Sequence, residues 1–117
     1  MNKTVSIKEN RLFRALYGRG KSASAKCMAV YVLKNRQKTV NRLGLTVSVK
    51  LGGAVVRNRI RRRLREVYRL HEHQLKEGFD IVIVARHRAY DAPFSQLESD
   101  WLRVADRLSL LREQQDA

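Results

Sequence analysis

The chain has 117 residues, 44% of them apolar and 31% charged, and its formal net charge is +14. This length fits a single domain over residues 1–117, and the longest apolar runs, at 27–33 and 81–85, are too short to cross a bilayer. Residues 1–65 contain 18 Lys and Arg but only one acid, Glu9, so we expect a polyanionic partner rather than a membrane or a small-molecule substrate.

The first third of the chain predicts one helix and one strand. Leu and aromatic residues recur every four positions in NRLFRALY, residues 10–17, which predicts a short helix ended by Gly18 and Gly20. The basic segment RGKSASAK follows as a loop, and CMAVYVLKN is typical of a strand. Cys27 is the only cysteine and lies in this apolar run, which predicts a buried thiol. A lone thiol and an N-terminus without the apolar stretch of a signal peptide favour the cytoplasm.

The middle of the chain predicts a strand, a long helix and a second strand. LTVSVKL, residues 45–51, alternates apolar with polar residues, as a half-buried strand does, and two glycines end it. Residues 54–75 predict a helix with arginines on one side and an apolar stripe on the other, formed by Val56, Ile60, Leu64, Val67 and His71. FDIVIVA, residues 79–85, is a nearly continuous apolar run, which indicates a central strand covered on both faces.

The last third predicts a final helix. Ser95 and Glu98 have the spacing of a capping box, and Pro93 precedes them. The apolar stripe that follows consists of Leu97, Trp101, Val104, Leu108 and Leu111. Because Trp101 lies on this stripe, we interpret it as a core residue rather than as a base-stacking platform. The element order α-β-β-α-β-α predicts a two-layer α/β sandwich, with a mixed sheet of about four strands packed by helices.

Two groups of residues predict nucleic-acid binding. RNRIRRRLR, residues 57–65, has six arginines in nine positions, and no acid occurs from Asn10 to Arg65. Arginines bind phosphates in bidentate fashion, whereas a merely solvated helix face usually mixes Glu with Lys. Phe13, Tyr17 and Tyr31 lie among further cations, a mixture that suits single-stranded nucleic acid. Each ring alone is more often a core residue, and only convergence of the three on one sheet face would favour binding.

The chain offers no recognisable catalytic or metal-binding residue. His71 and His73 are two apart on a helix and point in different directions, and Cys27 is distant in sequence. The acids have no spacing typical of two-metal phosphodiester chemistry, and the glycine pair at 52–53 is no Walker loop. If a reaction takes place, we expect a partner to perform it.

The stretch VSVKLGGAVVRNRIRRRLRE closely resembles the signature of the bacterial ribonuclease P protein subunit. The matching residues are Ser48, Lys50, Gly52, Ala54, Val55, Arg57, Asn58, Arg59, Arg61 and Arg62. RLFRALYGRG and GFDIVIVAR are similar to the family's first helix and late strand, with Tyr17 where phenylalanine is expected. The resemblance also implies a left-handed crossover between the two parallel strands, against the general right-handed rule.

The resemblance implies a protein that binds a catalytic RNA, ribonuclease P RNA, and the single-stranded 5′ leader of precursor tRNA. The RNA, with its Mg²⁺ ions, would perform the endonucleolytic removal of the leader. The implied leader cleft consists of Phe13, Tyr17, Tyr31, Ser48 and Arg86, and the implied RNA-binding residues are Lys50, Arg57, Asn58, Arg59, Arg61, Arg62, Arg63 and Arg65. Of these, Arg57, Asn58, Arg61 and Arg65 would reach the edge of the cleft, while Arg59, Arg62 and Arg63 would touch the catalytic RNA. The alternative is a general RNA-binding or ribosome-associated module without leader processing.

Overall fold

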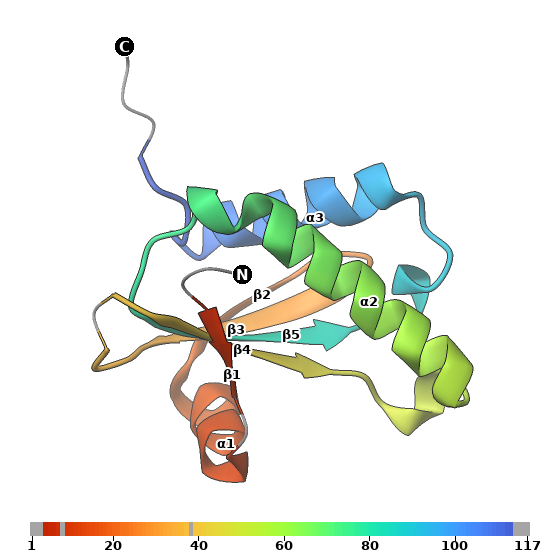
Figure 1. Ribbon diagram of the computed structural model, residues 1–117, viewed down its shortest axis with the longest axis horizontal. Helices are drawn as coiled ribbons and strands as arrows, with labels where there is room; N and C mark the ends of the chain where they lie inside the picture. The colour runs from red at the N-terminus through yellow and green to blue at the C-terminus, as the bar shows by residue number, and fades with distance from the viewer. Residues whose placement is uncertain (1–3, 8, 38, 114–117) are drawn as a thin grey trace.

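The computed structural model describes residues 4–7, 9–37 and 39–113, which form one mixed sheet and three α-helices (Figure 1). The strands are β1 (Thr4–Ser6), β2 (Lys21–Ser24), β3 (Met28–Lys34), β4 (Asn41–Thr46) and β5 (Phe79–Ala85). The helices are α1 (Asn10–Arg19), α2 (Ala54–His71) and α3 (Phe94–Arg107), with 3₁₀ turns η1 (Val49–Leu51), η2 (Glu72–Gln74) and η3 (His87–Ala89). The five strands lie in the order β1-β4-β5-β3-β2, which agrees with the predicted α/β sandwich.

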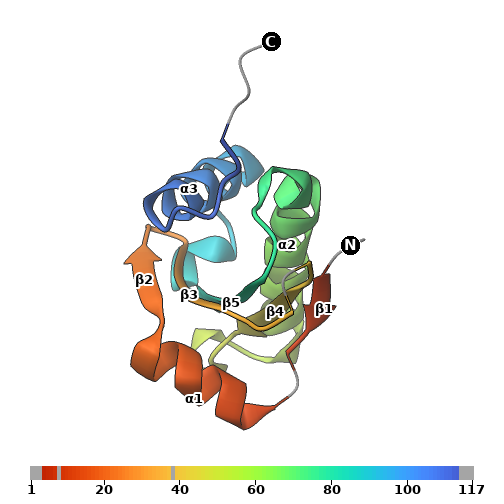
Figure 2. The ribbon, with the colours of Figure 1, turned by 90° about the vertical axis from the view of Figure 1, so that its left-hand side faces the viewer.

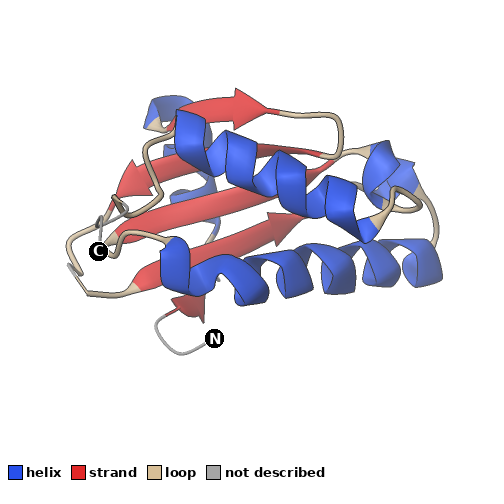
Figure 3. Cartoon of the chain, turned by 90° about the horizontal axis from the view of Figure 1, so that it is seen from above, coloured by secondary structure: helices blue, strands red, loops and turns tan. Residues whose placement is uncertain are grey.

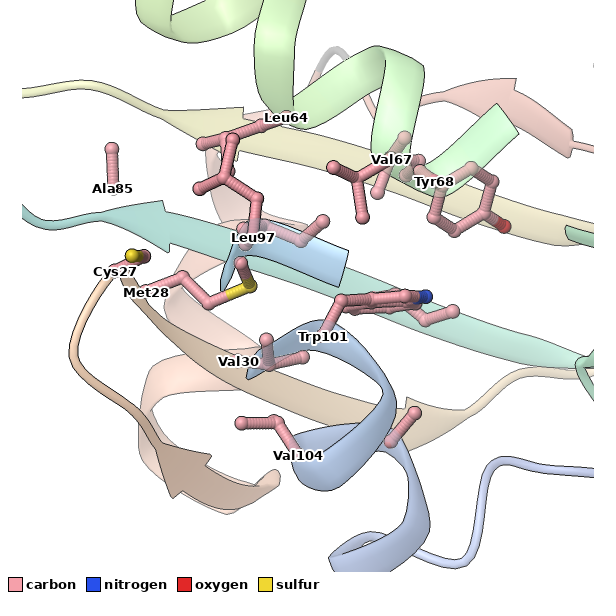
Figure 4. Close-up of a cluster of buried hydrophobic side chains, with 14 of the residues drawn as sticks. Cys27, Met28, Val30, Leu64, Val67, Tyr68, Ala85, Leu97, Trp101 and Val104 are labelled. Carbon is pink, nitrogen blue, oxygen red and sulfur yellow. The ribbon is translucent and has the colours of Figure 1, made fainter. Parts of the chain in front are cut away.

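Helices cover both faces of the sheet. Figure 2 shows α1 on one face and α2 with α3 on the other, which accounts for two apolar cores. The larger core joins the sheet to the buried stripes of α2 and α3, and Trp101 lies at its centre with no exposed surface (Figure 4). The smaller core packs Leu16 of α1 against Val82 of β5. The core position of Trp101 and the central parts of both predicted stripes are therefore confirmed. The last helix is shorter than its predicted stripe, because α3 ends at Arg107; Leu108 is its C-cap residue and Leu111 forms an isolated β-bridge with Leu75.

The strand β5 is central, as its nearly continuous apolar sequence predicts. It pairs with β4 in parallel and with β3 in antiparallel register. Between the parallel strands, α2 runs back across the face seen in Figure 3, where β4 and β5 point the same way and the crossover is left-handed. The resemblance implied this hand, which the general rule for β-α-β units would not have given.

Three element predictions are wrong in their boundaries. The strand predicted at 45–51 is β4, which starts at Asn41 and ends at Thr46; Val49 then lies in η1 and is 72% exposed. The alternation misled because the side chain of Ser48 accepts a hydrogen bond from the Lys50 amide and turns the chain. The helix predicted to Leu75 ends at His71, and the segment predicted as a basic loop contains the edge strand β2.

The predicted capping box at the start of α3 is absent. Pro93 is the N-cap residue and the helix begins at Phe94, so Ser95 lies inside the first turn and caps nothing. The backbone φ of Pro93, −54°, suits a helix start because proline fixes this angle and lacks the amide that an N-terminus leaves unpaired.

Substitution by alanine should have opposite effects on stability at two glycines in or next to α1. A Cβ on Gly20 would stand 2.5 Å from the Leu16 carbonyl oxygen and 2.8 Å from that of Val32, whereas a Cβ on Gly18 would meet nothing within 4 Å. We expect Gly20→Ala to lower the free energy of unfolding by about 1–3 kcal/mol, because backbone atoms must move. Gly18→Ala, inside the helix, should raise it by about 0.5–1 kcal/mol. Urea denaturation of both variants measures this, and equal effects would contradict the packing described for Gly20.

Candidate nucleic-acid interface

The three aromatic residues predicted from the sequence gather on the face of the sheet that α1 covers. The rings of Tyr17 and Tyr31 meet edge to face with centroids 4.9 Å apart. Phe13 packs over β4, where a Cβ on Gly44 would stand 2.7 Å from its ring, so the glycine makes room for the phenylalanine. We call Phe13, Tyr17 and Tyr31 the aromatic cluster. Tyr17 is 43% exposed, and such a ring is available for stacking.

One member of the aromatic cluster, Tyr17, reaches the end of β4 from which the chain continues toward α2. Tyr17 Oη and Thr46 Oγ1 are 2.9 Å apart and share a hydrogen bond, and Thr46 is the last residue of β4. The chain then passes Ser48 and the exposed Lys50 in η1 before α2 begins at Ala54. The end of β4 therefore connects the contact of Tyr17 to the segment that leads into the arginine-rich helix α2.

The buried apolar stripe of α2 determines the direction in which its arginine side chains point. Ile60, Leu64, Val67 and Tyr68 are buried, which directs the intervening arginines away from the core. Arg62 and Arg65 are exposed, and both line a hollow of about 640 Å³ beside the start of α3. The other lining residues are Arg59, Arg63, Arg69, Glu66 and Phe94. Glu66 is the one acid there, and its hydrogen bonds with Arg69 lower the pKa of its carboxyl.

Two of the predicted RNA-binding arginines hold a loop of the protein itself. Arg63 donates hydrogen bonds to the carbonyl oxygens of Ala89 at 2.7 Å, Tyr90 at 2.9 Å and Ala92. Arg59 donates to the Tyr90 carbonyl at 3.1 Å and lies over the Tyr90 ring. Partial burial and, next, the charge of Arg59 lower the pKa of Arg63. These arginines join α2 to the segment that connects β5 with α3, a role that sequence spacing does not reveal.

The remaining predicted residues have less specific surroundings. Arg57 donates through Nε to the Gly52 carbonyl at 3.1 Å, and Arg61 donates to Asn58 Oδ1 at 3.2 Å. Asn58 therefore accepts from its own helix and keeps its amide donors available. Arg86 follows β5 and donates to the Ala25 carbonyl at 3.1 Å, in the turn between β2 and β3. Among the described residues, no side-chain hydrogen bond or ring contact joins Arg86 to the aromatic cluster.

Sequence reasoning missed two exposed apolar residues at the start of α2. Val49 is 72% exposed and Val55 is 84% exposed, on either side of the glycine pair. Large apolar side chains that stay exposed beside a basic surface are candidates for contact with a partner. The exposure of Val55 could have been predicted from the sequence, because Val55 falls outside the apolar stripe formed by Val56, Ile60 and Leu64.

The titratable residues outside the arginines form internal pairs. Within residues 4–7, 9–37 and 39–113, no group of three His, Cys, Asp or Glu is placed to hold a metal ion. His71 Nε2 and Glu98 Oε2 are 2.8 Å apart. Burial, followed by a hydrogen bond to Asp100, raises the pKa of the Cys27 thiol to about 11, so the thiol is neutral and unsuited to nucleophilic attack. In the same described part of the chain, no helix has the length and apolarity to span a membrane.

Known proteins share both the sequence and this fold. The family model described as Ribonuclease P matches residues 1–109. The ribonuclease P protein component of Clostridium botulinum strain 657 is 44% identical over 109 residues, which are 92% of this chain and 97% of that protein. The RNase P protein of Staphylococcus aureus has a TM-score of 0.80 at 33% identity, covering 92% and 97% of the two chains. That of Thermotoga maritima has a TM-score of 0.75 at 28% identity, covering 84% and 92%.

A five-stranded mixed sheet with an arginine-rich helix on one face and the partly exposed aromatic cluster on the other defines a small basic α/β protein suited to RNA. The matches extend over nearly the whole chain and include the left-handed unit that bears the arginines. The chain belongs to the ribonuclease P protein family, and it is the protein component of that ribonucleoprotein endoribonuclease.

Proposed function

We propose that this protein binds ribonuclease P RNA through α2 and the single-stranded 5′ leader of precursor tRNA through the aromatic cluster. The observation that carries the proposal is that Tyr17, whose ring meets that of Tyr31, contacts the end of β4 from which the chain leads to α2. Splayed bases of a single strand stack on aromatic rings, while cations hold the phosphates. Both requirements are met by neighbouring parts of one rigid sheet.

The arginines of α2 divide between two tasks in this proposal. Arg62 and Arg65 are exposed and line the hollow beside α3, where they would contact phosphates of the RNA subunit; for Arg65 this replaces the cleft edge that the resemblance implied. Arg57 and Arg61, closer to the start of α2, would lie at the edge of the leader cleft. Arg59 and Arg63 already satisfy backbone carbonyls, so their main task would be to hold the β5–α3 connection against α2. Phosphate contacts of this kind position an RNA without reading its sequence.

The proposal assigns the hydrolysis to the RNA subunit and its Mg²⁺ ions. The protein would raise the affinity for leader-bearing substrate and lower the Mg²⁺ concentration required, because its cations screen repulsion between RNA segments. Cys27 is an unpaired, neutral thiol, which is consistent with the cytoplasm as the place where this occurs.

The experiment is cleavage of precursor tRNA at low Mg²⁺ concentration by a bacterial ribonuclease P RNA, with and without this protein. Substrates carry leaders of several lengths, and the protein without the RNA is the control. We expect activation that requires the RNA and increases with leader length. Tight RNA binding without activation would favour a general RNA-binding module, and cleavage by the protein alone would contradict the proposal.

Binding should also depend steeply on salt. If the protein neutralises about six phosphates, a plot of the logarithm of the association constant against the logarithm of salt concentration should have a slope of about −4 to −5. Titrations of the RNA subunit at several KCl concentrations measure the slope. A slope near −1 would mean that most arginines of α2 face water in the complex.

A further inference from the structure

A second basic surface lies away from α2, between α3 and the turn that joins β2 to β3. It encloses a hollow of about 520 Å³, whose lining includes Lys26, Arg86, Arg88, Arg103 and Arg107 and no carboxylate. Figure 2 shows α2 and β1 on one side of the molecule and α3 and β2 on the other. This surface, which we call the α3–β2 hollow, is therefore separate from the exposed face of α2.

The cations of the α3–β2 hollow are not neutralised within the protein. All five side chains belong to exposed residues, and no ion pair among the described residues includes any of them. Arg103 and Arg107 are four apart on α3, a spacing at which like charges destabilise a helix. Asp91 lines a neighbouring hollow with Lys26 and Arg88, but it lines none of the α3–β2 hollow itself. A polyanion that covered this surface would relieve the repulsion.

The lining distinguishes the α3–β2 hollow from the aromatic cluster. Among the described residues, the lining contains guanidinium groups and His87 but no Phe, Tyr or Trp, so it favours contacts to phosphates over the stacking of unpaired bases. RNA helices keep their bases stacked and are recognised through backbone and shape. The arginines are also fixed on α3 and η3, elements packed onto the core, and such fixed charges suit a backbone of regular shape.

We propose that the α3–β2 hollow binds the sugar–phosphate backbone of a helical segment of ribonuclease P RNA. The protein would then contact that RNA on two sides, through α2 and through the edge formed by α3 and β2, while the aromatic cluster remains open to the leader. This inference rests on the proposed function for the identity of the RNA, but it does not depend on the leader contacts.

The test compares two doubly substituted proteins that lose the same charge. Arg103→Gln with Arg107→Gln removes two cations from the hollow and keeps good helix formers in α3. Lys34→Gln with Arg36→Gln removes two exposed cations near the end of β3. Association with ribonuclease P RNA, without substrate, is titrated over a range of KCl concentrations. We expect the α3 variant to bind several-fold more weakly than the control, with a salt slope less steep by about 2, one for each lost phosphate contact.

Two further measurements show whether weaker binding comes from unfolding or from lost leader contacts instead of from the hollow. The free energy of unfolding of the α3 variant should equal or exceed that of the wild type, because a like-charge pair is removed. Its activation of cleavage should keep the wild-type dependence on leader length. Equal affinities and slopes for the two variants, or a loss confined to precursor tRNA, would overturn the inference while leaving the proposed function intact. If the wild type itself neither binds nor activates the RNA, the proposed function fails.

Discussion

Replacing Trp101 by alanine should lower the free energy of unfolding by about 3–5 kcal/mol, the range for large-to-small changes of a buried aromatic residue. Its side chain has no exposed surface, and its ring lies 5.7 Å from that of Tyr68, centroid to centroid, where α3 packs on α2 (Figure 4). Truncation would open a cavity between two helices that the rigid sheet holds apart. Urea denaturation followed by circular dichroism measures the change, and a loss below about 1 kcal/mol would contradict the packing.

The matched control for this prediction is Trp101→Phe. Trp101 Nε1 is buried and has no hydrogen-bond partner among the described residues, so phenylalanine removes an unsatisfied donor along with part of the ring. The loss should therefore be clearly smaller than for alanine. The folded Trp101→Phe protein should bind ribonuclease P RNA as the wild type does. Weaker RNA binding at unchanged stability would contradict the purely structural role assigned to Trp101.

Elements whose side chains face the core could be predicted from the sequence. The stripe through Ile60 and Leu64, the apolar run of β5 and the stripe of α3 all reflect burial, which leaves a periodic signal. Edge strands leave no such signal, because β2 exposes Lys21, Ser22 and Ser24 and is defined by its pairing with β3. Its position depends on backbone hydrogen bonds to a distant segment, which no local pattern encodes.

Buried polar contacts likewise could not be predicted from the sequence. Asp80 is the polar residue that interrupts the apolar run of β5, yet it is buried and accepts hydrogen bonds from Arg42 at 2.6 and 2.7 Å. The two residues are 38 apart and meet because β4 and β5 pair in parallel. The same holds for Arg63 and the Ala89 carbonyl. Partners that are distant in sequence decide whether an arginine is available to RNA. Composition therefore predicts the charge of the protein, but only the fold shows which arginines can bind RNA.

Part of the candidate site could likewise be predicted from the sequence and part of it could not. The arginines of α2 could be located from their spacing, and the gathering of Tyr17 with Tyr31 was anticipated as a possible convergence on one sheet face. The α3–β2 hollow could not be predicted, because Lys26, Arg88 and Arg107 are far apart in sequence and lie in three different elements or turns. The acids of the second half of the chain also gave no reason to expect the α3–β2 hollow. That half carries no excess of positive charge, although several of its arginines gather on one surface.

Replacing Tyr17 by alanine should weaken binding of leader-bearing precursor tRNA to the holoenzyme by about 1–3 kcal/mol, the contribution of one base stacked on an aromatic ring. Tyr17 is 43% exposed, so its loss leaves the core of α1 intact and the protein folded. The measurement is the dissociation constant of precursor tRNA, with a leader of several nucleotides and with a leader of one nucleotide. Only the longer leader reaches the aromatic cluster in the proposed function, so only its binding should weaken.

Tyr17→Phe is the control that isolates the ring. It keeps the stacking surface and the edge-to-face contact with Tyr31, and it removes the hydroxyl that shares a hydrogen bond with Thr46. We expect near wild-type affinity for the longer leader, because an exposed neutral hydrogen bond contributes only about 0.5–1.5 kcal/mol to stability and none of the stacking. Equal losses for the phenylalanine and alanine variants would assign the effect to the Thr46 contact. An equal loss for both leader lengths would place Tyr17 at the RNA subunit instead of the leader.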